Sequence, residues 1–329
     1  MRAIQYHRFG DYDVLGLAAA PEPVAPAGWA VVRVAMAGVS PLDHTARLGK
    51  LPAGAIKPFP VVPGGTGIGV LVEPGDSTLR VGTRVAVGGG RYGLGVDGTW
   101  AEFVAVDPAN LVPVPDAVDD TAAAALTTGS GHLTALFALT EVVGFRPGQT
   151  VLAPGVGGAV GQGGVEIARV LGAAKAITTA TSSAKAANGR EAGFEVIDLT
   201  QESLRDGVKR ITDGKGVDVV LDGVGGALTG EALGALAVNG SLVSIGYSAG
   251  MAATIDVTDL IWKNAHIHGF RFALFTPAQV AAANARLLDL VAQKEISPLV
   301  DTVFPLAEAA DAQRRLIEGG PFGRVLLAV

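Results

Sequence analysis

The 329-residue sequence contains no cysteine, which excludes disulfide bonds and thiolate-ligated metal sites. Charged residues make up only 17% of the chain, and the formal net charge of −6 comes without long runs of one sign. A nucleic-acid surface needs clustered Lys and Arg, so we expect no nucleic-acid partner. Apolar residues make up 49%, enough for large buried cores, and the length suggests two domains.

Long apolar runs are also missing. Gly, Pro and charged residues interrupt each hydrophobic stretch before it reaches roughly 18 residues, the length of a membrane span. The N-terminal segment Met1–Tyr6 lacks the apolar core of a signal peptide. The sequence therefore predicts a cytoplasmic protein with no membrane partner.

The pattern of short apolar runs changes along the chain. The first 115 residues indicate strands, such as Ala30–Ala35 and Arg84–Val87, separated by Gly/Pro turns, and the prolines of Val112–Pro115 suggest a boundary. From about Asp120, strands alternate with helices. The expected strands are Thr150–Ala153, Ala176–Thr179, Val217–Leu221 and Leu242–Ile245, and the expected helices include Gly164–Leu171 and Leu228–Ala237. This alternation predicts an α/β fold with a doubly wound parallel sheet. A long helix at Pro277–Gln293 and a strand at Arg324–Val329 follow.

A glycine-rich turn is the strongest chemical motif. Gly155, Gly158 and Gly161 form a GxxGxxG pattern between a predicted strand and a predicted helix. Glycines at such a turn let the backbone approach a pyrophosphate, and the helix N-terminus supplies free N–H groups. The alternative is an ordinary Gly-rich turn in a Gly-rich protein, which the βαβ context disfavours.

The next strand bears on the choice between NAD and NADP. An acidic residue about 20 positions after the glycines usually binds the ribose of NAD. No Asp or Glu occurs between Glu166 and Glu191, whereas Ser182 and Lys185 follow the second strand. We therefore predict NADPH, with a 2′-phosphate bound by Ser182 and Lys185. Lys185 as an ordinary solvated lysine is the alternative.

Motifs along nearly the whole chain resemble the zinc-independent quinone oxidoreductases, the zeta-crystallin-like group of the medium-chain dehydrogenase/reductase superfamily. The matching segments are Met1–Ile4, Phe9-Gly10, Val14-Leu15, Ala37–Asp43 (AGVSPLD), Val62–Gly64, Val81–Val85, Leu133–Ala135 (LTA), Gly216–Gly226 (GVDVVLDGVGG), Gly240–Gly246 (GSLVSIG) and Gly323–Leu327 (GRVLL).

This resemblance implies a GroES-like β-rich catalytic domain, residues 1–120 and 272–329, around a Rossmann NADP-binding domain, residues 121–271. It also implies a homodimer or homotetramer, often paired through an edge strand near His266–Phe270. The cofactor-binding residues that it implies, together with those argued above, are Thr134, Gly155, Gly158, Ala159, Val160, Gly161, Ser182, Lys185, Gly223, Val224, Gly246 and Arg324.

The resemblance also bears on zinc. Zinc-dependent relatives have Cys near Ser40 and Gly-His-Glu where this chain has Gly64-Gly65-Thr66, and the histidines show no ligand spacing, so we expect no metal. Ser40 and Thr45 replace the usual Asn and Tyr of the group, with His44 beside them. These three are the catalytic candidates. His44 would be a proton donor, with a partly exposed loop histidine as the alternative.

Three functions follow from these expectations. The first is NADPH-dependent hydride transfer to a quinone or another conjugated carbonyl compound. The second is an alkene reductase acting on an enone, enal or enoyl thioester of a specialised pathway. The third is a crystallin-like protein that binds NADPH without turnover.

Overall fold

The computed structural model describes residues 1–329 and divides them into two compact units. Unit 1 comprises Met1–Gly129 and Phe275–Val329, and unit 2 comprises Ser130–Leu274. The sequence placed the first border after residue 120. The structure places it later because helix α2 (Asp120–Thr127) packs against the strands of unit 1.

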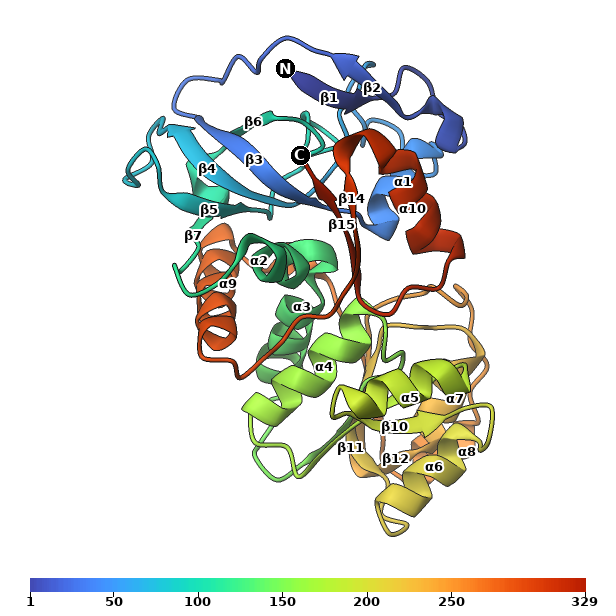
Figure 1. The fold of residues 1–329 in the computed structure, drawn as a ribbon. Coiled ribbons are helices and arrows are strands. Elements are labelled where there is room, and N and C mark those ends of the chain that lie inside the picture. The colour runs from blue at the N-terminus through green and yellow to red at the C-terminus, as the bar shows by residue number, and fades with distance from the viewer. The chain divides into compact units, whose positions relative to one another are not determined.

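Unit 1 is a β-rich unit built from both ends of the chain (Figure 1). Its strands are β1 (Arg2–Gln5), β2 (Gly16–Ala19), β3 (Ala30–Gly38), β4 (Gly67–Glu73), β5 (Arg84–Val87), β6 (Phe103–Val106), β7 (Leu111–Pro113), β14 (Val300–Pro305) and β15 (Arg324–Ala328); its other helices are α1 (Pro41–Arg47), α9 (Pro277–Ala292) and α10 (Ala309–Glu318). The C-terminal strand β15 pairs antiparallel with β3 and parallel with β14. The C-terminal segment therefore supplies two strands of this sheet.

Unit 2 contains one parallel sheet with the order β10-β9-β8-β11-β12-β13. The strands are β8 (Thr150–Leu152), β9 (Lys175–Ala180), β10 (Glu195–Asp198), β11 (Val217–Asp222), β12 (Leu236–Ser244) and β13 (His266–Gly269); the helices are α3 (Gly131–Phe137), α4 (Ala159–Val170), α5 (Ser183–Glu191), α6 (Leu204–Ile211), α7 (Ala227–Gly234) and α8 (Val257–Trp262). Counted along the chain, this order is 3-2-1-4-5-6, the Rossmann arrangement. The predicted fold class is confirmed, and β13 is an edge strand as expected. The order reverses between β8 and β11, where ligands of such sheets bind.

Three predicted boundaries are wrong: the starts of α4 and β12, and the end of α7, which lies at Gly234 and not at Ala237. Helix α4 begins at Ala159 and not at Gly164, although three of its residues are glycines of low helix propensity. Packing explains this, because a Cβ on Gly164 would lie 2.5 Å from the Cβ of Ala153 and one on Gly163 would lie 2.6 Å from the backbone nitrogen of His132. Strand β12 begins at Leu236, six residues before the predicted start at Leu242.

One stretch, Asp120–Val142, is long and apolar enough to span a membrane by length and composition alone, so the expectation of no such stretch was wrong. In the structure 78% of its most apolar window is buried inside the protein. The stretch is also interrupted at Gly129 and Ser130, where φ is 69° and 49°. A buried core helix of this composition passes the same test, so the match is weak evidence for a membrane.

Candidate functional site

The glycine turn of unit 2 lies at the carboxyl end of β8, where the strand order reverses. Gly155 has φ = 90°, a conformation that strains any residue with a side chain. Its backbone N–H donates to Thr179 Oγ1 at 3.1 Å, and the N–H of Val156 donates to the Thr179 carbonyl at 2.9 Å. The end of β9 therefore fixes the shape of this turn.

Close backbone approaches surround this turn. A Cβ on Gly161 would lie 2.0 Å from the carbonyl oxygen of Gly155, and one on Gly223 would lie 2.7 Å from the Cβ of Val160. A Cβ on Gly246 would lie 2.4 Å from the Gly223 carbonyl oxygen. The structure thus brings these predicted cofactor residues together beside the carboxyl ends of the parallel strands. None of the three glycines has room for a side chain.

The N-terminus of α4 has no side-chain cap. Its N-cap residue is Gly158, in the extended conformation that a capping Ser or Asp normally adopts. First-turn N–H groups have no partner within a helix, and the helix dipole places partial positive charge beside them. The first turn contains Ala159, Val160 and Gly161. This arrangement fits an anionic group such as a pyrophosphate.

Asp222, at the end of β11, is a site residue that the sequence reasoning missed. Its buried carboxylate accepts the N–H groups of Val224 and Gly225 at 3.0 and 2.9 Å, and the hydroxyl of Thr229 at 2.5 Å. Its backbone carbonyl accepts the N–H of Gly246 at 3.1 Å. Asp222 therefore positions two predicted cofactor residues, Val224 and Gly246. The signal in the sequence is an Asp that ends an apolar strand just before a glycine turn.

The end of β9 leads directly into α5, with Ser182 as the N-cap residue. Ser182 Oγ accepts the N–H of Lys185 at 3.3 Å. Lys185 is half-buried and makes no salt bridge, so its ammonium group has no carboxylate partner in the protein. Asp198, at the end of the neighbouring strand β10, accepts hydrogen bonds from Thr200, which lower the pKa of its carboxyl group.

The structure places two other predicted cofactor residues elsewhere. Thr134 is buried on α3, which packs tightly against α4 within unit 2. Arg324 lies on β15 of unit 1, where it is buried and its backbone N–H donates to Leu299 at 2.8 Å. The contacts of both with a cofactor stay predictions.

The three catalytic candidates lie together at helix α1 of unit 1. Ser40 is its N-cap residue, and its hydroxyl donates to Asp43 Oδ2 at 2.7 Å. The same carboxylate accepts the N–H of Ser40 at 2.8 Å, and its other oxygen accepts the N–H of Gly64 at 3.2 Å. Burial raises the pKa of the Asp43 carboxyl, and these hydrogen bonds oppose that effect. Ser40 and Asp43 thus form a capping box. Thr45 donates its hydroxyl to the Pro41 carbonyl at 3.0 Å.

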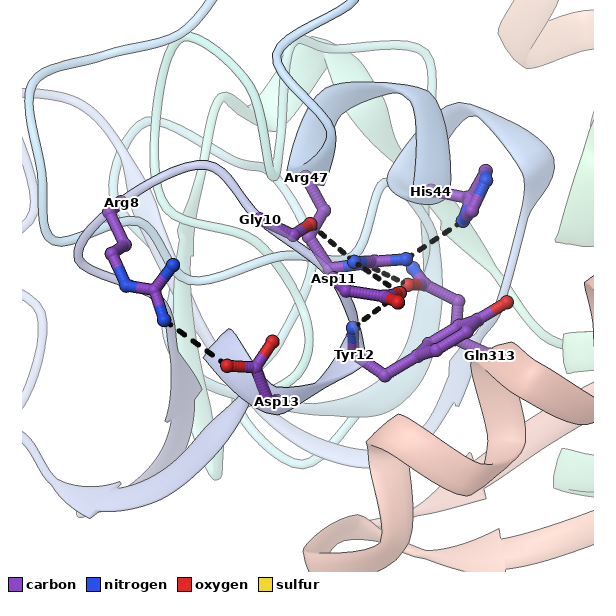
Figure 2. A network of polar contacts seen from close by, with 8 residues as sticks. All are labelled: Arg8, Gly10, Asp11, Tyr12, Asp13, His44, Arg47 and Gln313. Carbon is purple, nitrogen blue, oxygen red and sulfur yellow. Dashed lines mark hydrogen bonds and ion pairs between the residues drawn. The ribbon is translucent and has the colours of Figure 1, made fainter.

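His44 belongs to a polar network around Arg47 (Figure 2). Arg47 is 1% exposed and donates to the Gly10 carbonyl and to Gln313 Oε1, both at 2.5 Å. Its guanidinium also lies 4.4 Å from the ring centroid of Tyr12. Arg47 Nη2 lies 2.9 Å from His44 Nδ1. A guanidinium can only donate, so Nδ1 must accept and the neutral ring carries its proton on Nε2.

The charge state of His44 follows from the same contacts. Partial burial lowers its pKa, and the positive charges of Arg47 and Lys50 lower it further, against the opposing effect of Asp11 and Glu318. His44 is therefore a neutral ring at pH 7 that offers an N–H donor through Nε2. It is better suited to hydrogen bonding an oxygen than to releasing a proton as an imidazolium.

The described residues contain no group of three or more His, Asp or Glu side chains that could hold a metal ion. His132 is fully buried against Glu166, with 2.6 Å between Nε2 and Oε2, and so serves the packing of α3 on α4.

Two family profiles match the chain. Residues 26–116 match the alcohol dehydrogenase GroES-like domain, and residues 193–327 match the zinc-binding dehydrogenase family.

Curated relatives extend over most of the chain. The human synaptic vesicle membrane protein VAT-1 homolog is 30% identical over 99% of this chain and 86% of its own length. Quinone oxidoreductase-like protein 2 of Bos taurus is 31% identical over 82% of this chain and 77% of its own length. A phenolphthiocerol/phthiocerol polyketide synthase of Mycobacterium tuberculosis is 32% identical over 91% of this chain, which corresponds to 13% of that protein.

Solved structures show the same fold over the full length of this chain. An NAD-dependent alcohol dehydrogenase has a TM-score of 0.88 at 28% identity, with all of both chains covered. A quinone oxidoreductase of Pseudomonas syringae has a TM-score of 0.85 at 29% identity, with 99% of that chain covered. A mycobacterial protein in complex with NADPH has a TM-score of 0.84 at 28% identity, with 100% of that chain covered.

Proposed function

The chain belongs to the medium-chain dehydrogenase/reductase family, close to its quinone oxidoreductases, and on that premise we propose that it is an NADPH-dependent enzyme that transfers hydride to a quinone or another conjugated carbonyl compound without zinc. The observation that carries the proposal is the uncapped N-terminus of α4 beside the tightly packed Gly155 and Gly161. That arrangement suits a dinucleotide pyrophosphate.

The choice of NADPH rests on the end of β9. Lys185 offers an unpaired ammonium group, and no carboxylate lies on the turn between β9 and α5. A ribose 2′-phosphate would gain a charge-assisted contact there, whereas a ribose diol would lack its usual carboxylate acceptor. Among the similar structures, one is described as NAD-dependent and another contains NADPH. The comparisons therefore do not identify the cofactor, and the argument for NADPH rests on the residues of this chain.

Reduction without zinc is consistent with the ligand inventory. A catalytic zinc needs three protein ligands, and the chain offers no Cys and no cluster of three other ligands. A quinone or enone is electron-poor enough to accept hydride without a metal.

The proposal assigns a role to individual residues of the chain. Bound NADPH supplies the hydride from its nicotinamide ring. The first turn of α4 would hold the pyrophosphate, and Ser182 and Lys185 would hold the 2′-phosphate. Thr134 and Gly246 are the residues that the family resemblance assigns to the nicotinamide. His44, with its N–H on Nε2, is the candidate hydrogen-bond donor for an acceptor oxygen, and water would supply the proton that completes reduction.

One observation favours alkene reduction as the second candidate. The chain resembles a segment of a polyketide synthase at 32% identity over 91% of its length. An enoyl thioester is a conjugated carbonyl compound, so the same hydride donor would reduce its double bond. The two candidate functions therefore differ in the hydride acceptor and share the same cofactor site.

The decisive experiment measures NADPH oxidation against 1,4-naphthoquinone, an α,β-unsaturated ketone, an enal and an enoyl thioester. We expect turnover with the quinone. Turnover with the thioester alone would favour the second candidate. Tight NADPH binding, followed by nicotinamide fluorescence, without oxidation by any acceptor would overturn both and indicate a non-catalytic NADPH-binding protein.

The substitution Lys185→Ala tests the cofactor preference. Losing one charge-assisted contact should raise the NADPH dissociation constant about tenfold and leave that of NADH unchanged. Lys209→Ala is the control, because Lys209 is an exposed lysine on α6. Equal kcat/KM values for NADH and NADPH in the unmodified protein would contradict the NADPH assignment.

We also propose that the enzyme acts in the cytoplasm as a homodimer or homotetramer. The edge position of β13 supports pairing between copies, since an open strand edge presents unpaired N–H and C=O groups.

A further inference from the structure

Two histidines lie on the edge strand β13, remote in the sheet from the glycine turn. His266 and His268 are alternate residues, so they share one face of the sheet. Their ring centroids are 6.2 Å apart and the rings are nearly parallel. His266 is exposed and His268 is partly exposed. Neither belongs to the proposed cofactor site, since β12 and β11 separate β13 from β8.

The outer edge of β13 has unpaired backbone groups. The N–H of Phe270 donates to Ser244 of β12, so the even-numbered residues of β13 direct their backbone groups inward. Along a parallel strand these groups alternate in direction, so Ile267 and Gly269 direct theirs outward. The strand carries no Lys, Pro or bulge, the features that keep other strands from pairing with such an edge.

Exposed apolar side chains surround this edge. Ile267 is 46% exposed, and on the preceding helix α8 Val257 is 58%, Ile261 is 66% and Trp262 is 79% exposed. No residue of α8 is buried. A patch of this kind beside an open strand edge favours a protein partner. The partner that fits is a second copy of this chain, because an antiparallel strand edge is complementary to itself.

The geometry of such a pairing fixes where the histidines lie. A two-fold axis perpendicular to the continuous sheet places the same face of both copies on the same side of the sheet. An even-numbered residue of one copy therefore lies opposite an even-numbered residue of the other, and an odd-numbered residue lies opposite an odd-numbered one. The outward-facing Ile267 and Gly269 then form the hydrogen-bonded pairs, and the histidines fall in the non-hydrogen-bonded pairs. Opposite Cα atoms in such pairs are about 4.5 Å apart. This result holds whichever of His266, Ile267 or His268 lies on the axis.

We propose that, in the homodimer paired antiparallel along β13, His266 and His268 of both copies together form a site for a divalent transition-metal ion such as Zn²⁺. Imidazole nitrogen is a preferred ligand of Zn²⁺, Ni²⁺ and Cu²⁺, and four ligands complete a tetrahedral zinc site. One chain alone provides only a pair of ligands. The metal therefore stabilises the dimer and takes no part in hydride transfer. The inference rests on the proposed homodimer.

The test uses the full-length protein without a histidine tag, freed of metal with EDTA and then dialysed. Sedimentation velocity should show dimers, and calorimetric titration with ZnCl2 should show about one Zn²⁺ per two chains. Zinc should lower the dimer dissociation constant at least about tenfold, the effect of a ligand that binds only the dimer. The double variant His266→Gln/His268→Gln should remain dimeric in EDTA and lose zinc binding.

Further variants separate the possible failures. Ile267→Lys, at a half-exposed position, should give monomers in EDTA, and Trp262→Ser should weaken the dimer. His7→Gln is the matched control, because His7 is an exposed histidine of unit 1, and it should bind zinc normally. Unchanged zinc stoichiometry in the double variant, or an unchanged dimer in Ile267→Lys, overturns the inference. NADPH binding by each variant is measured in parallel, so a failed cofactor site is recognised separately.

Discussion

Two helices of this protein, α1 and α4, each begin a few residues after a strand, but only one of them has a side-chain cap at its N-terminus. At α1, Ser40 and Asp43 form a reciprocal capping box, so side chains occupy the first N–H groups. At α4, the N-cap residue is Gly158, and no side chain caps the helix. A strand–turn–helix segment can therefore serve packing or ligand binding. In this protein the two segments differ in the side chain at the N-cap.

The energetics support this distinction. Replacing a Ser or Asp cap by Ala destabilises a helix by about 1 kcal/mol. Replacing the same cap by Gly costs only about a few tenths of a kcal/mol. Helix α4 thus gives up little stability by having no side-chain cap. Helix α1 takes the full benefit of its cap and offers no anion site.

Installing a cap on α4 should have the largest effect. Gly158 has φ = −83° and ψ = 163°, which any residue adopts, so Gly158→Asp should fold. Its carboxylate would occupy the first-turn N–H groups and repel a pyrophosphate. We expect the NADPH dissociation constant to rise about 100-fold, since each charge-assisted hydrogen bond lost costs roughly 1.5–3 kcal/mol. Nicotinamide fluorescence titration measures it.

The control for this change is Gly158→Ala, which adds the Cβ without a carboxylate. That Cβ would lie 3.2 Å from the Gly155 carbonyl oxygen, a tight but tolerable distance. It should retain most of the affinity. If Gly158→Asp binds NADPH as well as Gly158→Ala does, the uncapped helix is not the pyrophosphate site.

Removing the cap of α1 should have a smaller effect, and on stability. Ser40→Ala should lower the free energy of unfolding by about 1 kcal/mol, measured by urea denaturation, and leave NADPH affinity unchanged. Thr45→Val is the matched control, because the Thr45 hydroxyl only bonds back to Pro41 within the helix. A large loss of turnover in Ser40→Ala at unchanged stability would assign Ser40 a direct role in the reaction.

The smallest expected effect concerns pH and His44. Its pKa is lowered in the folded protein, so its contribution to stability is fully present above the unfolded pKa of about 6.5 and is lost as pH falls through the folded value. Protonation would end the hydrogen bond from Arg47. The thermal midpoint should fall slightly more between pH 7 and 5 in the unmodified protein than in His44→Gln, whose amide oxygen still accepts from Arg47. Parallel curves would contradict the assigned neutral ring.

Much of unit 2 could be predicted from the sequence because its signals are local. Strands β8, β9 and β11 are short β-branched runs, and their predicted bounds agree with the structure to within about a residue. The glycine turn was identified because its spacing reflects backbone contacts between near neighbours, such as Gly155 and Gly161. The start of α4 was not, because packing against α3 and β8 overrides the low helix propensity of its glycines.

The surroundings of His44 in unit 1 were less accessible to prediction because their contacts connect distant segments. The structure shows Arg47 buried between Gly10 and Gln313, which lie far apart in the sequence. That contact sets the tautomer and charge of His44. No local pattern contains this information.

The sequence by itself determined the fold class, the lack of thiolate ligands and the position of the glycine turn, because composition and short-range spacing encode them. Only the tertiary structure decided which helix N-terminus lacks a side-chain cap. It also decided that Ser40 is occupied as a cap, that Asp222 fixes the second turn, and that His44 is a neutral donor. Hydrogen-bond partners and burial set these properties, and both arise only when segments distant in the chain pack together.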